Sequence, residues 1–223
     1  MPIFLFDAFG SASIGVYTLA TDNLLIVPNQ ISKSDAKKLG EWLGVKVIQT
    51  NIGGSVLIGS LVCANSNGMI LPHFVRDEEL EIIKSSSDIN ITIMDTKKTA
   101  YGNLVLANDR GAIVDPRLRR KEMKRIEDTL DVEVVAGEIA GLPYVGSLAL
   151  ATNKGVLAHP LLTEDEEKIL REVLKVHVGI GTINCGIPYI ATGVIGNSRA
   201  AVAGYLTTGP EIVMIGQALG VVE

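Results

Sequence analysis

Residues 61–74 read LVCANSNGMILPHF, and three other stretches of the chain repeat the same phrase. The related stretches are LVLANDRGAIVDPRL at 104–118, LALATNKGVLAHPLL at 148–162 and the weaker VIGNSRAAVAGYL at 194–206. A phrase repeated at a nearly fixed period indicates an architecture of repeated units more than it indicates a single site. The repeat therefore decides which fold we expect.

A small residue marks the start of each repeat. These anchors are Gly15, Gly59, Gly102, Gly146 and Ala191, whose numbers differ by 44, 43, 44 and 45. Nine residues after the anchors stand Leu24, Gly68, Gly111, Gly155 and Ala200. Three of these are glycines that follow a polar residue, which predicts tight hairpin turns with positive φ. Pro28, Pro72, Pro116 and Pro160 come next, and they should end the second strand because proline has no N–H to donate.

A helix and a third strand should follow each proline. Thr163 precedes a run of acidic residues, which is typical of a helix N-terminus. Leu39, Trp42 and Leu43 recur at helical spacing before Gly44, which is typical of a helix end. Runs rich in β-branched residues follow at 45–48, 89–93, 132–135 and 176–180. The repeated unit is therefore predicted to be strand, strand, helix, strand (ββαβ).

The fifth unit is too short to contain its own third strand. The apolar segment PIFLF at 2–6 belongs to no complete unit and can supply that strand. Such pairing would close the chain into a ring, which explains why no polar capping units are found at its ends. We expect an α/β (α+β) fold in a single domain over 1–223, a five-fold pseudo-symmetric ring of ββαβ repeats closed by the N-terminal strand. The repeats cover approximately 11–54, 55–98, 99–142, 143–187 and 188–223 plus strand 2–6.

Composition narrows the functional classes. The chain has 223 residues, 47% hydrophobic and 20% charged, which predicts order throughout. A formal charge of −5 disfavours binding of nucleic acid through a general positive field, although a local basic patch is compatible with it. No apolar run reaches membrane-spanning length and no signal peptide pattern precedes the first unit, so we expect a cytoplasmic protein. Cys63 and Cys185 are expected to be reduced thiols.

Four stretches carry a resemblance to a known family: NIGGSVLIGSLVCANSNGMILPH at 51–73, AYGNLVLANDRGAIVDP at 100–116, VGSLALATNKGVLAHP at 145–160 and TTGPE at 207–211. In order and spacing they closely resemble the translation initiation factor 6 family, most of all its archaeal form. The resemblance covers essentially the whole chain. It implies a pentein-like β/α propeller, in agreement with the ring that the repeats predict.

The resemblance also implies a function. Members of this family are non-catalytic proteins that bind the joining face of the large ribosomal subunit, block the small subunit from joining and act in large-subunit maturation. They contact a ribosomal protein beside the sarcin–ricin loop, with limited contact to ribosomal RNA. Their release is linked to a protein of the Shwachman–Bodian–Diamond family and to a GTPase resembling elongation factor 2. We expect a monomer without a cofactor.

The hairpin turns are the candidate binding residues, because symmetry places them on one rim of the ring. Short polar side chains and free backbone groups there should form a flat docking surface, and loops on rigid scaffolds commonly bind partners. The candidate ribosome-binding residues are Asn65, Asn108, Asp109, Arg110, Asn153, Lys154, Asn197 and Arg199. The resemblance singles out Asn108. The alternative is that asparagine and aspartate stand in these turns only because they tolerate turn geometry.

An enzymatic alternative rests on Cys185. Pentein-like rings include hydrolases and amidinotransferases that attack a guanidinium carbon with a cysteine assisted by histidine and acidic residues. Here His73, His159 and His177 match no such motif, and a buried, inert thiol is the simpler expectation for Cys185. The same histidines have no metal-ligand spacing, so neither a metal nor a catalytic residue is predicted.

One dense basic segment, RLRRKEMKR at 117–125, stands out in the acidic chain. It is compatible with contact to ribosomal RNA and also with a solvated helix face balanced by Glu127 and Asp128. The acidic residues at other helix starts, such as Asp77 to Glu79, are expected to interact with helix dipoles rather than to act as catalytic acids.

Overall fold

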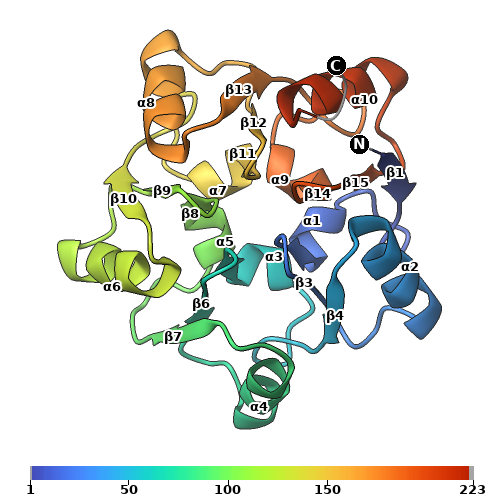
Figure 1. Ribbon diagram of the computed structural model, residues 1–223, viewed down its shortest axis with the longest axis vertical. Coiled ribbons are helices and arrows are strands. Elements are labelled where there is room, and N and C mark those ends of the chain that lie inside the picture. Colours follow the sequence, from blue (N-terminus) through green and yellow to red (C-terminus); the bar gives the residue numbers. More distant parts are fainter. Residues whose placement is uncertain (1, 221–223) are drawn as a thin grey trace.

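Each repeat of the sequence folds into one short helix, two antiparallel strands, one longer helix and a third strand. The structure is a computed structural model that describes residues 2–220. Its five units surround a central axis, with the longer helices on the outside and the short helices near the centre (Figure 1). The ring predicted from the repeats is confirmed.

The elements recur in the same order around the ring. The short helices are α1 (Ile14–Tyr17), α3 (Ile58–Leu61), α5 (Tyr101–Leu104), α7 (Val145–Leu148) and α9 (Ile190–Gly193). The first strands are β2 (Leu19–Ala20), β5 (Cys63–Ala64), β8 (Val105–Ala107), β11 (Ala149–Ala151) and β14 (Val194–Gly196). The second strands are β3 (Leu24–Val27), β6 (Gly68–Pro72), β9 (Gly111–Val114), β12 (Gly155–Ala158) and β15 (Ala201–Gly204). The longer helices are α2 (Lys33–Leu43), α4 (Asp77–Ser86), α6 (Arg120–Leu130), α8 (Glu164–Leu174) and α10 (Gly209–Ala218). The third strands are β4 (Lys46–Gln49), β7 (Asn90–Met94), β10 (Glu133–Ala136), β13 (His177–Ile180) and, in the fifth unit, β1 (Ile3–Phe6).

The second strand is the middle strand of every three-stranded sheet. It pairs antiparallel with the first strand through a short turn and parallel with the third strand, as β3 does with β2 and β4. A parallel pair needs a crossover connection, and in the first four units the longer helix provides it. This is why each unit carries its longer helix on the outer side of its sheet.

The N-terminal strand closes the ring. β1 pairs parallel with β15, with Ile3 opposite Ala201 and Phe6 opposite Gly204. It therefore occupies the third-strand position of the fifth unit, as the apolar segment 2–6 predicted, and Figure 1 shows β1 beside β15 and α10.

The core lies between neighbouring units as well as inside them. Leu39 and Leu43 of α2 pack in one buried cluster with Ile195 and Val202 of the fifth unit. In the same way Ile126 of α6 joins a cluster that includes residues of the second unit. Because such helices cover the seam to the preceding unit, closing the ring buries apolar surface that an open chain of units would expose.

The short helices were not predicted from the sequence. Their anchor glycines lie where the units meet around the axis, and a Cβ on Gly59 or Gly102 would overlap the carbonyl oxygen of the preceding anchor, Gly15 or Gly59. At these anchors the short helices therefore pack backbone to backbone, and a side chain there would require a shift.

The prediction of positive φ is wrong for a second set of glycines. Gly68, Gly111 and Gly155 begin second strands, and none of them has positive φ. A Cβ there would overlap the carbonyl oxygens of Thr129, Val173 and Ala218, which lie near the C-terminal ends of longer helices in the next unit. Close approach between units, rather than turn geometry, explains these glycines.

The predicted helix ends are confirmed. The Thr163 side chain accepts a hydrogen bond from Glu166 N–H at the start of α8, and Gly44 ends α2 with φ 65°. Within residues 2–220, no helix is long and apolar enough to cross a membrane.

Candidate functional site

The ring presents two faces, one at each end of its strands. The asparagine face is formed by the turns between first and second strands, at 21–23, 65–67, 108–110, 152–154 and 197–199. The aromatic face lies at the opposite strand ends and is formed by the turns between units, the starts of the short helices and the residues after the prolines. A four-residue strand spans about 13 Å, so these two faces are separate surfaces.

Three asparagines of the asparagine face are buried. The Asn108 side chain, 4% exposed, donates from Nδ2 to the carbonyl oxygens of Thr152 (3.1 Å) and Leu174 (2.9 Å). Its Oδ1 accepts hydrogen bonds from Arg110 N–H and Gly111 N–H of its own turn. Every polar atom of this carboxamide is therefore used inside the protein.

Asn65 and Asn197 repeat this arrangement. Their Nδ2 atoms donate to Leu130 O at 2.8 Å and to Leu43 O at 2.9 Å, the last residues of α6 and α2. Each of the three asparagines thus donates to a carbonyl at the C-terminal end of the next unit's helix, where the last carbonyls have no partner within the helix. These three side chains are not free for a partner, because their amide groups hold neighbouring units together.

The next residue of each turn points to the axis, and all five of these side chains are linked by hydrogen bonds. Asp109 accepts from Ser66 N–H, from Ser66 Oγ and from Asn153 Nδ2 at 2.8, 2.7 and 2.6 Å. Asp22 accepts from Ser198 N–H, from Ser198 Oγ and from the same Asn153 Nδ2 at 2.7, 2.7 and 2.8 Å. We call these five residues the axial clasp. Because Asn153 bridges two carboxylates, the clasp reaches across the axis of the ring.

The clasp sets the charge state of Asp22. Burial favours the neutral acid, but hydrogen bonds from Ser198 and Asn153 and the charge of Arg199 outweigh it and lower the pKa of Asp22. Asp22 therefore stays ionised at neutral pH, with both oxygens occupied. Of the predicted site residues, Asp109 and Asn153 thus belong to the scaffold of the ring.

The exposed candidates on the asparagine face are Arg110, Lys154 and Arg199. Arg110 Nη1 donates to Lys175 O at 2.7 Å, and Arg199 Nε donates to Leu43 O at 3.1 Å. Both guanidinium groups thereby lie at helix C-terminal ends, where cations are favourable. The solvent-exposed sides of both guanidinium groups remain accessible to a binding partner.

The aromatic face carries an apolar sector that sequence reasoning missed. Tyr144, Tyr189 and Tyr205 are 46, 47 and 48% exposed. Together with exposed aliphatic and aromatic neighbours they form the aromatic sector: Phe9, Leu142, Tyr144, Leu161, Ile187, Tyr189, Tyr205 and Leu206. A signal was present, because apolar residues occupy loop positions beside the prolines and anchors in the last two units.

Contacts across the unit boundaries support the sector. Arg117 lies over the Tyr144 ring at 4.9 Å, and the rings of His159 and Tyr189 meet edge to face at 6.5 Å. Phe9 and Tyr205 line one shared hollow. Amphipathic rings held on a rigid scaffold provide contact area at low entropic cost, and tyrosine is enriched at protein interfaces.

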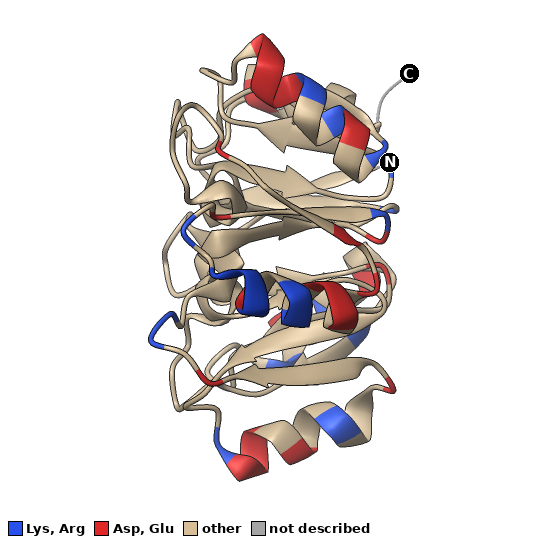
Figure 2. Ribbon diagram, turned by 90° about the vertical axis from the view of Figure 1, so that its left-hand side faces the viewer, with Lys and Arg blue, Asp and Glu red and all other residues tan. Residues whose placement is uncertain are grey.

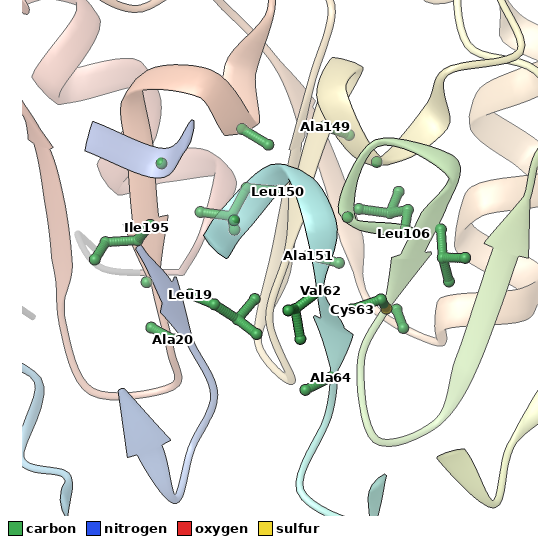
Figure 3. A pocket seen from close by; sticks show the side chains of 18 of the residues that line it. Leu19, Ala20, Val62, Cys63, Ala64, Leu106, Ala149, Leu150, Ala151 and Ile195 are labelled. Atoms are coloured by element: carbon green, nitrogen blue, oxygen red, sulfur yellow. The ribbon is translucent and has the colours of Figure 1, made fainter. Parts of the chain in front are cut away.

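The centre of the ring holds a small apolar cavity of about 80 Å³ (Figure 3). Apart from Thr18 and Cys63, the residues that line it are glycine, alanine and larger aliphatic residues. Burial raises the pKa of the Cys63 thiol to about 12, so it remains protonated and a poor nucleophile. This cavity offers little to catalysis.

Cys185 differs from the sequence prediction. Its thiol is free, as expected, but it is exposed rather than buried, in a turn where Cys185 has φ 65°. The adjacent carboxylate is Glu211, which accepts hydrogen bonds from Cys185 N–H (3.1 Å) and Gly186 N–H (2.8 Å). Glu211 therefore binds the backbone of the turn and is not free to act as a base.

Acidic neighbours balance three of the six cations in the basic segment. Lys124 pairs with both Glu127 (3.2 Å) and Asp128 (3.0 Å), the two residues expected to neutralise this helix. Arg117 and Arg119 pair with Asp115 and Glu122. Within residues 2–220, no group of three or more histidine, cysteine or acidic side chains is arranged to hold a metal ion.

The closed arrangement of five ββαβ units defines the pentein-like class of β/α propellers, and the exposed chemistry of this member lies on its two faces. The model of the eIF-6 family matches residues 3–218. The chain belongs to that family, which confirms the resemblance seen in the sequence.

Two relatives illustrate the match. Translation initiation factor 6 of Methanocaldococcus jannaschii is 46% identical over 219 residues, covering 96% of each chain. Translation initiation factor 6 of Cenarchaeum symbiosum is 41% identical over 218 residues, covering 98% of this chain and 99% of the relative. Among solved structures, an agmatine deiminase of C. jejuni with bound substrate matches with a TM-score of 0.36 and 15% identity over 56% of this chain and 50% of the other. This structural likeness is partial and supports no inference about activity.

Proposed function

We propose that this protein binds the joining face of the large ribosomal subunit and thereby keeps the small subunit from joining. Membership of the eIF-6 family supports a role in translation. The observation that carries the proposal further is the aromatic sector, an exposed apolar surface on a rigid ring. Such surfaces on soluble proteins commonly mark binding sites for other proteins.

The mechanism needs no chemical step. A stable docking surface buries about 800 Å² on each partner and combines an apolar centre with a polar rim. The aromatic sector supplies the apolar centre, and we assign it to a large-subunit protein beside the sarcin–ricin loop. The bulk of the ring then occupies the space that the small subunit needs. Blocking is therefore a consequence of position and size.

The asparagine face is the second candidate surface. The residues proposed from the sequence are Asn65, Asn108, Asp109, Arg110, Asn153, Lys154, Asn197 and Arg199. Their burial and hydrogen bonds support direct contact by Arg110, Lys154 and Arg199, with the others fixing the turns from which these cations project.

The further features of this proposal come from the family resemblance. The protein acts as a cytoplasmic monomer, without cofactor or catalysis, and also takes part in large-subunit maturation. Its release involves a protein of the Shwachman–Bodian–Diamond family and a GTPase resembling elongation factor 2.

Cosedimentation with purified large subunits tests the proposal and separates the two faces. We expect Tyr189→Ser/Tyr205→Ser to weaken binding strongly, because it removes two aromatic anchors. Arg110→Ser/Lys154→Ser, its counterpart on the other face, should weaken binding less. If the wild-type protein fails to travel with large subunits, the proposed function is wrong. If only the second variant is impaired, the docking face is wrong.

The alternative, a guanidino-group hydrolase using Cys185, has one observation in its favour, the exposure of the thiol. It lacks a free base at that position, because Glu211 is engaged by the turn. Rapid alkylation of Cys185 at neutral pH, together with turnover of a guanidino compound, would support the enzymatic alternative.

A further inference from the structure

The first half of α6 carries cations that belong to neither of the two proposed docking surfaces. Arg120 and Lys121 are exposed in its first turn, and Lys97 is exposed on the preceding inter-unit turn. Lys98, beside Lys97, donates from Nζ to Arg117 O at 2.6 Å, which joins that turn to the segment entering α6. Figure 2 views the ring edge-on, with the positive half of α6 toward one face and its negative end toward the other.

The exposed cations of this region fall into two groups, whereas the half-buried Arg125 donates from Nη2 to Ile93 O at 2.8 Å. Arg117, Arg119 and Lys124 are held by acidic partners at 2.7 to 3.2 Å. Lys97, Arg120 and Lys121 make no salt bridge to any residue within 2–220. We call these three the free cations. They are the positive charges available to a partner, whereas the solvated-helix interpretation holds for Lys124.

Two cations of α6, Arg120 and Lys121, lie at the end of the helix where positive charge is unfavourable. The positive end of a helix dipole favours acidic residues, and α8 begins with Glu164 to Glu167 accordingly. In α6 the first turn contains Arg120 and Lys121 beside the capping Glu122, while Glu127 and Asp128 stand toward the C-terminal end. Helix stability does not explain this reversal. This arrangement of charges concentrates positive potential at one edge of the aromatic face, and that potential favours the binding of a polyanion.

The free cations adjoin the aromatic sector. Arg117 is four residues from Lys121 and lies over the ring of Tyr144, which belongs to that sector. A partner seated on the aromatic sector therefore brings its own neighbouring surface against the boundary between the third and fourth units. On a ribosomal subunit, the polyanion at such a surface is RNA.

We propose that Lys97, Arg120 and Lys121 bind the phosphate backbone of an RNA segment that borders the docked protein on the large subunit. This inference rests on the proposed function and adds a division of labour to it: the aromatic sector contacts protein and the free cations contact RNA. The contact is with phosphates, so it positions the ring without reading base sequence.

The salt dependence of large-subunit binding tests this inference. In Lys97→Gln/Arg120→Gln/Lys121→Gln, the slope of log affinity against log KCl concentration should become shallower by about 2 to 3, because three phosphate contacts are lost. Affinity at low salt should fall on the order of 10-fold to 100-fold. The control Lys37→Gln/Lys84→Gln/Lys168→Gln makes the same change of net charge on α2, α4 and α8 and should leave the slope unchanged.

The outcomes separate the two proposals. An unchanged slope in the first variant while the wild type binds normally would overturn the RNA contact and leave the proposed function intact. Failure of the wild type to bind would remove both. An equal change of slope in the control would assign the effect to net charge and would also overturn the site.

Photo-cross-linking identifies the partner. A benzophenone amino acid in place of the exposed Asp95, two residues from Lys97, should become attached to ribosomal RNA when the large-subunit complex is irradiated. The product must then be sensitive to ribonuclease. Attachment to a ribosomal protein alone would show that the free cations face an acidic protein segment, and the inference would be wrong.

Discussion

Residues at equivalent positions of the repeats have different roles, and the turns of the asparagine face show this most clearly. Asn65, Asn108 and Asn197 bind helix ends, whereas the corresponding Thr152 only holds its own turn through Lys154 N–H and Gly155 N–H. The sequence predicted the turns correctly. It could not predict the bridges, because their acceptors, such as Leu174 O, are 66 residues away in the chain.

Replacing Asn108 separates a scaffold role from a contact role. Asn108→Ser leaves two buried carbonyl oxygens without a donor, so we expect a loss of about 1–3 kcal/mol in the free energy of unfolding. Urea denaturation measures it, with Asn29→Ser as a control at an exposed position. Weaker large-subunit binding by a variant that keeps full stability would instead show that Asn108 contacts the partner directly.

Glu211 links stability to pH. Burial opposes its ionisation, but hydrogen bonds from Thr208 N–H, Gly186 N–H and the Thr182 and Thr208 hydroxyls outweigh burial and lower its pKa to about 2. A depressed folded-state pKa stabilises the protein fully above the unfolded-state value near 4.5. That contribution is lost as pH falls toward about 2.

Glu211→Gln should therefore lower the free energy of unfolding at neutral pH by at most about 3 kcal/mol. The difference from wild type should shrink as pH falls from about 4.5 toward 2. Denaturant titrations at a series of pH values measure the difference. A gap that stays constant across this range would contradict the assigned role of the carboxylate.

A helix or strand could be predicted from the sequence where it is long enough to show a full period of apolar residues. The longer helices and the third strands show helical spacing or β-branched runs, and they lie where these patterns placed them. The short helices have four residues each, too few for an amphipathic period, and tertiary packing stabilises them instead of propensity. The apolar residues of the aromatic sector were visible in the loops, but their exposure could not be predicted, because an apolar residue in a loop has no periodicity that assigns it to a face.

The anchor glycines give a test of the ring of short helices. Gly59→Ala places a Cβ onto the carbonyl oxygens of Gly15 and Thr18, neither of which can move as a side chain can. We expect a destabilisation of about 3 kcal/mol or more, measured by thermal or urea unfolding. Ala191→Gly, at the one anchor that already carries a Cβ, should change stability by only about 1 kcal/mol. Equal effects at both positions would mean that close approach does not explain the glycines.

The whole molecule is held together by contacts that cross from each unit to the next. Longer helices cover neighbouring sheets, asparagines bind neighbouring helices, and β1 joins the first segment of the chain to the last sheet. We propose on this basis that the five units form one domain and unfold in a single transition. Two separate transitions in calorimetry would show that parts of the ring fold independently.

The ring also explains how a symmetric scaffold can serve an asymmetric partner. The five units share a backbone, but the aromatic sector is formed mainly by the last two, with Phe9 and Leu142, and the free cations stand on the second and third units. The repeated phrase thus predicted architecture, whereas the differences between its copies carry the proposed function. Sequence reasoning placed that function on the asparagine turns because the repeats draw attention there.

The central claim is that the ring blocks subunit joining by docking through its aromatic sector. The most direct measurement is the fraction of joined ribosomes on sucrose gradients when large and small subunits are mixed with the protein. We expect wild type to lower this fraction and Tyr189→Ser/Tyr205→Ser, checked for intact folding, to restore it. Unchanged joining with wild type, or full blocking by the folded variant, would contradict the account.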